Sequence, residues 1–320
     1  MIKIKYIFPL FLFLGFLYFV YGINSKISEK HIVENGVIDL SDYEINSNGP
    51  IALNGKWAFF FGKTVNPGDV SSLPDGYMDV PAEWSTYNFS AKKYSNYGFA
   101  SYRVIIKGIP ENSKMALKVR ECGTAYEILI NGKKAAVQGS FSEKPENGKP
   151  DYKPQVVFFE GKQNTEIVVH ISNYHHRASG IWYSILVGTE EDIIKLREKK
   201  LSLEMFFFGI LIIMGMYYIS IYILRNKEVS ALYFGVFCLL IAMRIIVTGE
   251  NFMQVLIGNK SWELMRKVEY LTFYFTIPLF YSFARTIFPK YISKYNIYVS
   301  LVIVSIFTLM TCFTDIKFYS

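Results

Sequence analysis

Cysteine is scarce in this chain, with three residues among 320. Cys238 and Cys312 lie in long apolar runs, and only Cys122 lies in a segment of soluble character. A disulfide within the soluble segment is therefore excluded, because that segment holds a single thiol. Cysteine usage consequently gives no information on the redox compartment in which the protein folds.

The motifs of common enzyme classes are also missing. The sequence has no His-Glu-x-x-His zinc motif, no Cys-x-x-Cys pair and no Gly-x-Ser-x-Gly nucleophile elbow. The net charge is +7, but no cluster of Lys and Arg is accompanied by base-reading motifs. We therefore expect no enzymatic activity, no cofactor and no nucleic-acid partner.

Hydrophobic residues are abundant instead, at 51% of the chain, and 17% of the residues are aromatic. At the start, Lys3 and Lys5 precede an apolar run from Tyr6 to Gly22. This layout is that of a secretory signal peptide or of an uncleaved N-terminal anchor, and residues 1–22 are consistent with both. Either alternative exports the residues that follow.

Residues 23–188 have the character of β-structure, because Gly, Pro, Asn and Asp separate short runs rich in Val, Ile, Tyr and Phe. The connections are short and polar, which favours an antiparallel sandwich over alternating strands and helices. Asn131 and Gly132 provide the positive φ angles of a two-residue hairpin turn. The predicted strands cover residues 51–61, 101–107, 115–120, 126–130, 134–138, 155–159, 166–172 and 181–187.

A short juxtamembrane helix is predicted over residues 189–203. Apolar residues recur there among alternating charges, which is typical of a helix with one buried face. Thr189 is the expected N-cap, and acidic residues follow in the first turn, where the helix dipole favours negative charge. We expect this helix to lead almost directly into the membrane.

Residues 204–320 contain four long apolar runs, at 205–224, 230–248, 270–288 and 297–313. A helix needs about 20 residues to cross a bilayer, and each run is near that length. The sequence therefore predicts four transmembrane helices in contact with lipid.

The charges of the connecting loops predict the orientation of these helices. The loops after the first and third runs carry Lys and Arg with little acid, which places them in the cytoplasm. Four basic residues of the juxtamembrane helix oppose this orientation, but long exported domains cross the membrane largely regardless of charge. We expect a multi-pass protein of the plasma or inner membrane with its β domain outside the cytoplasm.

Six segments carry a resemblance to a known family. They are "LNGKWAFFFGK" (53–63), "VPAEW" (80–84), "YGFASYRVII" (97–106), "GTAYEILINGK" (123–133), "YKPQVVFF" (152–159) and "ISNYHHRASGIWYSILVGTEEDI" (171–193). In this order, and followed by transmembrane runs, they resemble the bacterial seven-transmembrane receptors with diverse intracellular signalling modules, of the type with a jelly-roll extracellular domain.

The resemblance implies a jelly-roll, galactose-binding-like sandwich outside the cell, a seven-helix bundle and, in relatives, a C-terminal kinase, cyclase or phosphatase module. This chain departs from the pattern in having four spans and no output module, so we expect it to be a truncated receptor. The implied function is a membrane sensor for a small molecule or carbohydrate. A membrane-anchored carbohydrate-binding or carbohydrate-active surface protein remains the alternative, and homodimerisation stays open.

The predicted ligand contacts lie in the loop "YHHRASGIW" and are His175, His176, Arg177 and Trp182. Polar donors beside aromatic faces suit a sugar or another polar ligand. A metal site is disfavoured, because no Cys, Asp or Glu at ligand spacing accompanies the histidines. The alternative is that these side chains satisfy backbone carbonyls within the loop.

One polar pair is predicted in the helical part. Arg244 lies roughly 9 Å inside the expected outer boundary of its span, counted at about 1.5 Å per residue. Glu269 is expected at a similar height, so we predict that the two side chains pair. The alternative is that Arg244 extends toward the interface without a fixed partner.

Overall fold

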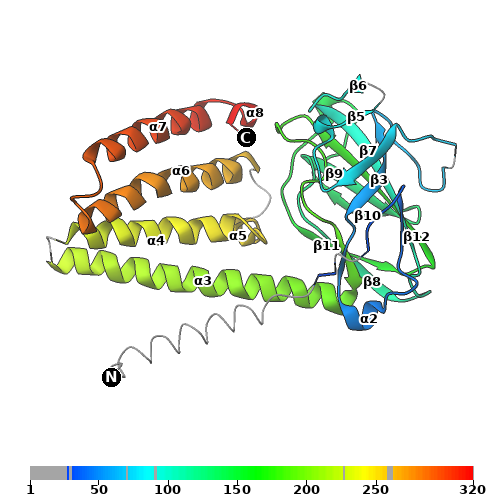
Figure 1. Ribbon diagram of the computed structural model, residues 1–320, viewed down its shortest axis with the longest axis horizontal. Helices are drawn as coiled ribbons and strands as arrows, with labels where there is room; N and C mark the ends of the chain where they lie inside the picture. Colours follow the sequence, from blue (N-terminus) through cyan, green and yellow to red (C-terminus); the bar gives the residue numbers. More distant parts are fainter. Residues whose placement is uncertain are drawn as a thin grey trace.

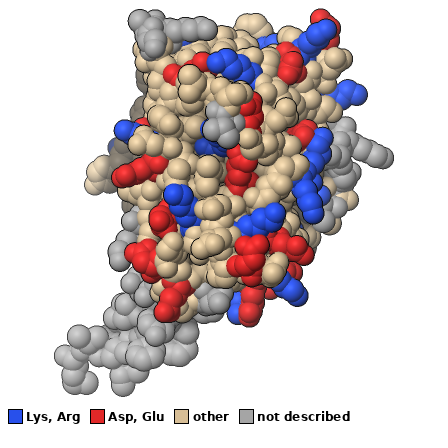
Figure 2. All heavy atoms as spheres, turned by 90° about the vertical axis from the view of Figure 1, so that its right-hand side faces the viewer, with Lys and Arg blue, Asp and Glu red and all other residues tan. Residues whose placement is uncertain are grey.

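The computed structural model describes residues 27–28, 31–69, 71–89, 92–225, 228–257 and 262–319. The predicted signal or anchor segment, residues 1–22, lies outside the described residues. Figure 1 shows two parts: a block of β-sheet and a layer of long helices that extends from one side of it. Figure 2 shows acidic and basic side chains intermingled on the face of the β block that points away from the helices.

The β block is built from two main sheets. The larger has the strand order β10-β9-β12-β7-β3-β4, with β1 pairing in parallel with β7, and the smaller has the order β11-β8-β13-β2. The strands of the first are β1 (Val37–Asp39), β3 (Gly55–Phe61), β4 (Gly76–Val80), β7 (Gly98–Lys107), β9 (Ala125–Ile130), β10 (Lys133–Gln138) and β12 (Asn164–Asn173). Those of the second are β2 (Ile51–Ala52), β8 (Lys114–Val119), β11 (Gln155–Glu160) and β13 (Leu186–Thr189). A separate pair joins β5 (Asn88–Phe89) to β6 (Lys92–Lys93), and the predicted all-β sandwich is confirmed.

Large apolar and aromatic side chains fill the core of the sandwich. Trp57, Phe59, Tyr102 and Tyr126 are fully buried there. Trp57 also satisfies its indole N–H by donating to the Leu53 carbonyl at 2.8 Å. Burying an aromatic side chain of this size stabilises the fold by a few kcal/mol, so these residues anchor the sandwich on which the loops depend.

The Asn-Gly hairpin forms as predicted between β9 and β10. Asn131 and Gly132 have φ angles of 49° and 83°, which is the left-handed geometry that a two-residue turn requires. Ile130 pairs with Lys133 across the turn. The hairpin lies at the edge of the larger sheet.

The run at residues 51–61 forms two strands instead of the single strand predicted. The break falls at Leu53 and Asn54, just before Gly55, where φ is +121° and a Cβ atom would lie 2.4 Å from the Val33 carbonyl oxygen. The close passage of Val33 therefore forces the chain to change direction. In the run at 181–187 only the end belongs to β13, because Ile181 instead bridges Ala82 and Cys122.

Helix α3 (Glu190–Arg225) is continuous over 36 residues, so the predicted juxtamembrane helix and the first predicted span form one helix. Thr189 caps it as predicted: its hydroxyl oxygen accepts a hydrogen bond from the Asp192 amide at 3.2 Å. The remaining helices are α2 (Ile45–Asn48), α4 (Val229–Val247), α5 (Phe252–Ile257), α6 (Trp262–Ile287), α7 (Lys294–Phe313) and α8 (Ile316–Tyr319).

Among the described helices, α3, α4 and α7 are long and apolar enough to cross a membrane. Helix α6 holds the third predicted span, but tyrosine and threonine residues in its middle lower its mean hydropathy. Figure 1 shows α6 between α4 and α7, and it packs against both. Four spans were predicted, and three helices meet the requirement for apolar character.

Two glycines allow α3 and α4 to pack closely. A Cβ atom on Gly215 would lie 2.7 Å from a methyl carbon of Leu239, and one on Gly235 would lie 3.0 Å from the Gly215 carbonyl oxygen. Small residues at such a crossing are typical of helices that associate in a membrane.

Candidate functional site

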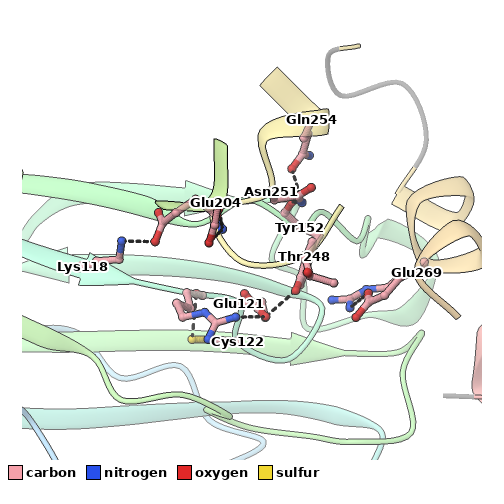
Figure 3. Close-up of polar contacts among 12 residues, drawn as sticks. Lys118, Glu121, Cys122, Tyr152, Glu204, Thr248, Asn251, Gln254 and Glu269 are labelled. Carbon is pink, nitrogen blue, oxygen red and sulfur yellow. Dashed lines mark hydrogen bonds and ion pairs between the residues drawn. The ribbon is translucent and has the colours of Figure 1, made fainter. Parts of the chain in front are cut away.

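The sandwich meets the helical layer at a junction rich in buried polar side chains (Figure 3). The sandwich contributes Lys118, Glu121, Asp151 and Tyr152. The helical part contributes Glu204, Arg244, Glu250, Asn251, Gln254, Arg266 and Glu269. Buried polar groups require hydrogen-bond partners, so the two parts hold each other in a defined arrangement.

A first set of contacts crosses the junction through Tyr152. Its hydroxyl donates to Glu121 at 2.6 Å, and the guanidinium carbon of Arg266 lies 3.5 Å from the centre of its ring. Burial raises the pKa of the Tyr152 phenol well above its usual range, so this hydroxyl remains a donor. Arg266 then forms an ion pair with Glu269 at 2.7 Å. The contacts thus run without a break from a sandwich carboxylate to helix α6.

The predicted side-chain pair of Arg244 and Glu269 is corrected by the structure. The two residues touch, but Arg244 donates to the backbone carbonyl of Glu269 at 2.9 Å. The Glu269 carboxylate is occupied by Arg266, which lies three residues earlier on the same helix. Arg244 also lies over the Phe273 ring, 5.3 Å from its centre. It therefore joins α4 to α6 without a side-chain ion pair to Glu269.

A second set of contacts joins α5 and the residue before it to the sandwich. The Asn251 amide donates to the Tyr152 carbonyl oxygen at 2.9 Å, and the Gln254 amide donates to the Asp151 carboxylate at 2.9 Å. Asn251 has a φ of 55°, a conformation that Asn tolerates better than most residues. The chain at Asn251 is therefore shaped to present this side-chain amide to the sandwich.

A third set is centred on Lys118, which is only 3% exposed. Its ammonium group pairs with Glu250, whose backbone N–H donates to the Glu204 carboxylate at 3.2 Å. Burial lowers the pKa of Lys118, and the Glu250 carboxylate offsets part of that effect. Gly249 has a φ of +67°, which favours glycine, and a Cβ atom there would displace the Glu204 carboxylate.

The loop predicted to contact a ligand is largely engaged with itself. The Asn173 side-chain amide donates to the carbonyl oxygens of His176 and Ala178, at 2.8 and 2.9 Å. His176 is 9% exposed, and its Nδ1 accepts from the Ala178 amide at 3.0 Å. Its ring lies 4.7 Å from that of Trp182. These contacts correspond to the alternative named above, in which side chains satisfy the loop's own backbone.

The four predicted contact residues differ in their surroundings. His176 and Trp182 pack on each other, Arg177 is exposed, and His175 is directed toward helix α6. His175 bonds to the Gly148 carbonyl at 3.1 Å, and its ring lies 6.4 Å from that of Trp262. His175 thus reaches the junction through its contact with the Trp262 ring.

A polar hollow of about 370 Å³ lies at the same junction. Its lining residues are Val137, Gly139, Ser140, Lys149, Pro150, Asp151 and Trp262. Lys149, Asp151 and Trp262 therefore line one space between the sandwich and the first turn of α6. This combination offers orienting polar groups beside a flat apolar surface.

We expect acid to destabilise the protein through His176. Burial first, and the Arg266 charge second, lower the pKa of this histidine from 6.5 to about 4. The folded state favours the neutral ring, and its contribution to the free energy of unfolding is fully present above pH 6.5. This contribution is lost as the pH falls toward 4, a loss of about 3 kcal/mol. Thermal unfolding of the detergent-solubilised chain between pH 7 and 4 measures it, and His176→Asn should flatten the profile. The matched control His175→Asn keeps His176 and should keep the full acid loss; equal profiles for both variants would contradict the assignment.

Sequence patterns did not identify Glu121, Tyr152 or Arg266 as functional residues. Arg266 lies between the second and third predicted spans, where a basic residue is unremarkable. Its burial results from packing against the sandwich, a contact between distant segments that the local sequence does not indicate. One signal was available: acid and base are evenly mixed in residues 250–269, which is suited to pairing across an interface.

The comparisons with known proteins concern each part separately. Among solved structures, a β-glucuronidase from Ruminococcus gnavus in complex with uronic isofagomine is 17% identical with a TM-score of 0.35, over 45% of this chain and 29% of that one. The Faecalibacterium prausnitzii β-glucuronidase is 13% identical with a TM-score of 0.32, over 43% and 31%. The chain spans less than a third of the length of these enzymes.

No curated protein matches the chain. Residues 200–320 match the family model described as 7TM diverse intracellular signalling. These residues comprise most of α3 and all of α4, α6 and α7. The similarity to the 7TM diverse intracellular signalling family thus covers the helical part of the chain.

Proposed function

We propose that this protein is a multi-pass membrane sensor whose sandwich lies outside the cytoplasm, binds a small polar ligand and transmits its occupancy to the helices. The observation that carries the proposal is the unbroken series of contacts from Glu121 through Tyr152 and Arg266 to Glu269. A ligand shifts an equilibrium only when it binds two states of the protein differently. Because the contacts at the junction are specific and buried, two arrangements of the sandwich and the helices would differ in which residues pair.

The junction has the capacity for such a second arrangement. Within the described part of the chain, the second carboxylate oxygen of Glu121 and the Nε atom of Arg266 make no hydrogen bond. Groups of this kind favour any rearrangement that pairs them, because an unpaired buried polar atom costs about 1–3 kcal/mol. A small displacement of the sandwich relative to α6 would change which partners they contact.

The ligand site that fits this role best is the junction hollow. A polar ligand seated between Lys149, Asp151 and Trp262 would touch the sandwich and the start of α6 at once. Its binding would therefore depend directly on how the two parts are arranged. The predicted loop contributes through His175, whose ring contacts Trp262.

The proposed orientation agrees with the helix directions. Arg225 at the end of α3 and the loop between α6 and α7 lie at the end of the layer away from the sandwich (Figure 1). Basic segments at one end of a bundle favour the cytoplasm for that end. The sandwich would then face the exterior.

Ligand screening on the full chain in lipid nanodiscs tests the proposal. The probes are neutral monosaccharides, uronic acids and amino acids, with binding measured by thermal shift. For any probe that binds, we expect Lys149→Ala to weaken binding by about tenfold, the loss of one charge-assisted hydrogen bond. Lys153→Ala removes an exposed lysine outside the hollow and serves as the matched control.

The second measurement is hydrogen exchange along the helices with and without the bound probe. A sensor requires altered exchange at the start of α6 and in the adjoining helices. A probe that binds at the hollow and leaves exchange in α3, α4 and α6 unchanged would refute signalling. That outcome would favour a surface protein for which the helices serve only as an anchor.

A further inference from the structure

A second hollow lies at the opposite end of the helical layer, far from the sandwich. It has a volume of about 340 Å³ and opens between the start of α4, the end of α6 and the start of α7. Its lining residues are Val229, Tyr233, Ser282, Arg285, Thr286, Lys294, Ile297 and Tyr298. The proposed sensing role makes no use of this hollow.

The charged residues that line this hollow have one sign. Arg285 and Lys294 both line it, and no carboxylate is among the lining residues. Arg285 donates one N–H to the Ile292 carbonyl, which fixes the guanidinium at the end of α6. A guanidinium has five N–H donors, so this bond leaves others to face the hollow. The phenol groups of Tyr233 and Tyr298 add neutral donors, and the whole set suits a phosphate group.

The surroundings of the hollow are apolar. Val229 and Ile297 line it, and the outward face of α7 continues away from it through exposed side chains such as Val302 and Ile306. A free anion makes no use of such a surface, whereas an acyl chain would cover it. Basic pockets between transmembrane helices commonly hold the headgroups of anionic lipids.

The positions of the two cations match the depth of a headgroup. Lys294 is the first residue of α7, and Arg285 lies two residues before the end of α6. The ends of membrane helices lie near the polar boundary of the bilayer, where phosphate groups are found. We propose that this hollow binds the phosphate of an anionic phospholipid, with Arg285 and Lys294 as its ligands and the α7 face against an acyl chain. The inference is independent of any ligand at the sandwich.

Lipid binding by the purified chain in neutral detergent tests this assignment. The probes are phosphatidylglycerol, phosphatidylcholine and inorganic phosphate, and the readout is retained lipid by native mass spectrometry together with titration. We expect phosphatidylglycerol to bind in preference to phosphatidylcholine. Lys294→Gln should weaken its binding by about tenfold, the effect of losing one charge-assisted hydrogen bond.

Lys290→Gln is the matched control, because Lys290 is an exposed lysine near the same end of the layer and does not line the hollow. It should change binding by less than about twofold. Arg285→Lys, which keeps the charge but loses the planar fork, should also weaken binding while circular dichroism shows an intact fold. Equal losses for Lys290→Gln and Lys294→Gln, or equal binding of both phospholipids, would overturn the site. Displacement of phosphatidylglycerol by inorganic phosphate at matching concentration would overturn the lipid as its occupant.

Discussion

Replacing Arg266 with glutamine is expected to lower the free energy of unfolding by about 3–5 kcal/mol, the usual cost of removing one partner from a buried ion pair. Arg266 is 7% exposed, so its loss leaves the Glu269 carboxylate without its partner and removes the cation over the Tyr152 ring. The full chain in detergent, unfolded thermally and followed by near-UV circular dichroism, provides the measurement. Hydrogen exchange of residues 250–257 should rise at the same time, because the junction would loosen.

Lys267→Gln is the control for this substitution. Lys267 is the next residue on α6 and pairs with Glu263 at 2.8 Å, but this pair is partly exposed. Its loss should cost less than about 1 kcal/mol. A double-mutant cycle of Arg266→Gln with Tyr152→Leu should give a coupling energy of about 1 kcal/mol or more, as residues in contact do. Purely additive effects would show that the stacked contact does not join the two parts.

Replacing Glu250 with alanine is expected to cost about 3–5 kcal/mol, because it leaves the Lys118 ammonium buried without a carboxylate. Arg197 and Lys200 also act on Lys118 with like charge, which adds to the cost. The double variant Lys118→Met with Glu250→Leu removes both charges and should recover most of the lost stability. Thermal unfolding of the wild type and these variants measures the difference.

The pH dependence of the Glu250→Ala variant provides an independent check. The folded pKa of Lys118 lies below its usual value, so stability rises with pH between the folded pKa and the unfolded value near 10.5. Without Glu250 the folded pKa falls further and this window widens. The variant should therefore regain stability relative to the wild type as the pH is raised toward 10. A constant deficit across that range would mean that Lys118 is not the source of the loss.

The sequence predicted the sandwich well, because its signals are local. The Asn131-Gly132 turn and the alternating apolar runs each determine structure within a few residues. The division of residues 51–61 was not predictable in this way, since it depends on Val33 passing close to Gly55. Contacts between distant segments leave no periodic pattern in either segment.

In the candidate site, too, local features were predictable from the sequence and contacts between distant groups were not. The loop 174–182 was recognised by its residue types, but the hydrogen bonds of Asn173 that turn it inward involve backbone carbonyls, which composition does not reveal. Arg244 and Glu269 were placed at a similar height by counting residues, and they do touch. Arg266 occupies the Glu269 carboxylate, so Arg244 contacts the backbone carbonyl instead. Counting residues along the helices did not take Arg266 into account.

The continuity of helix α3 has a mechanical consequence. At about 1.5 Å per residue, its 36 residues form a rod roughly 54 Å long. Strand β13 ends at Thr189 and the rod begins at Glu190, so no linker separates the sheet from the rod. A rod of this length amplifies rotation: tilting it by about 1° at the sheet moves its far end, at Arg225, by roughly 1 Å. Angular changes at the sandwich too small to alter its core would thus displace the far end of the helix by atomic distances.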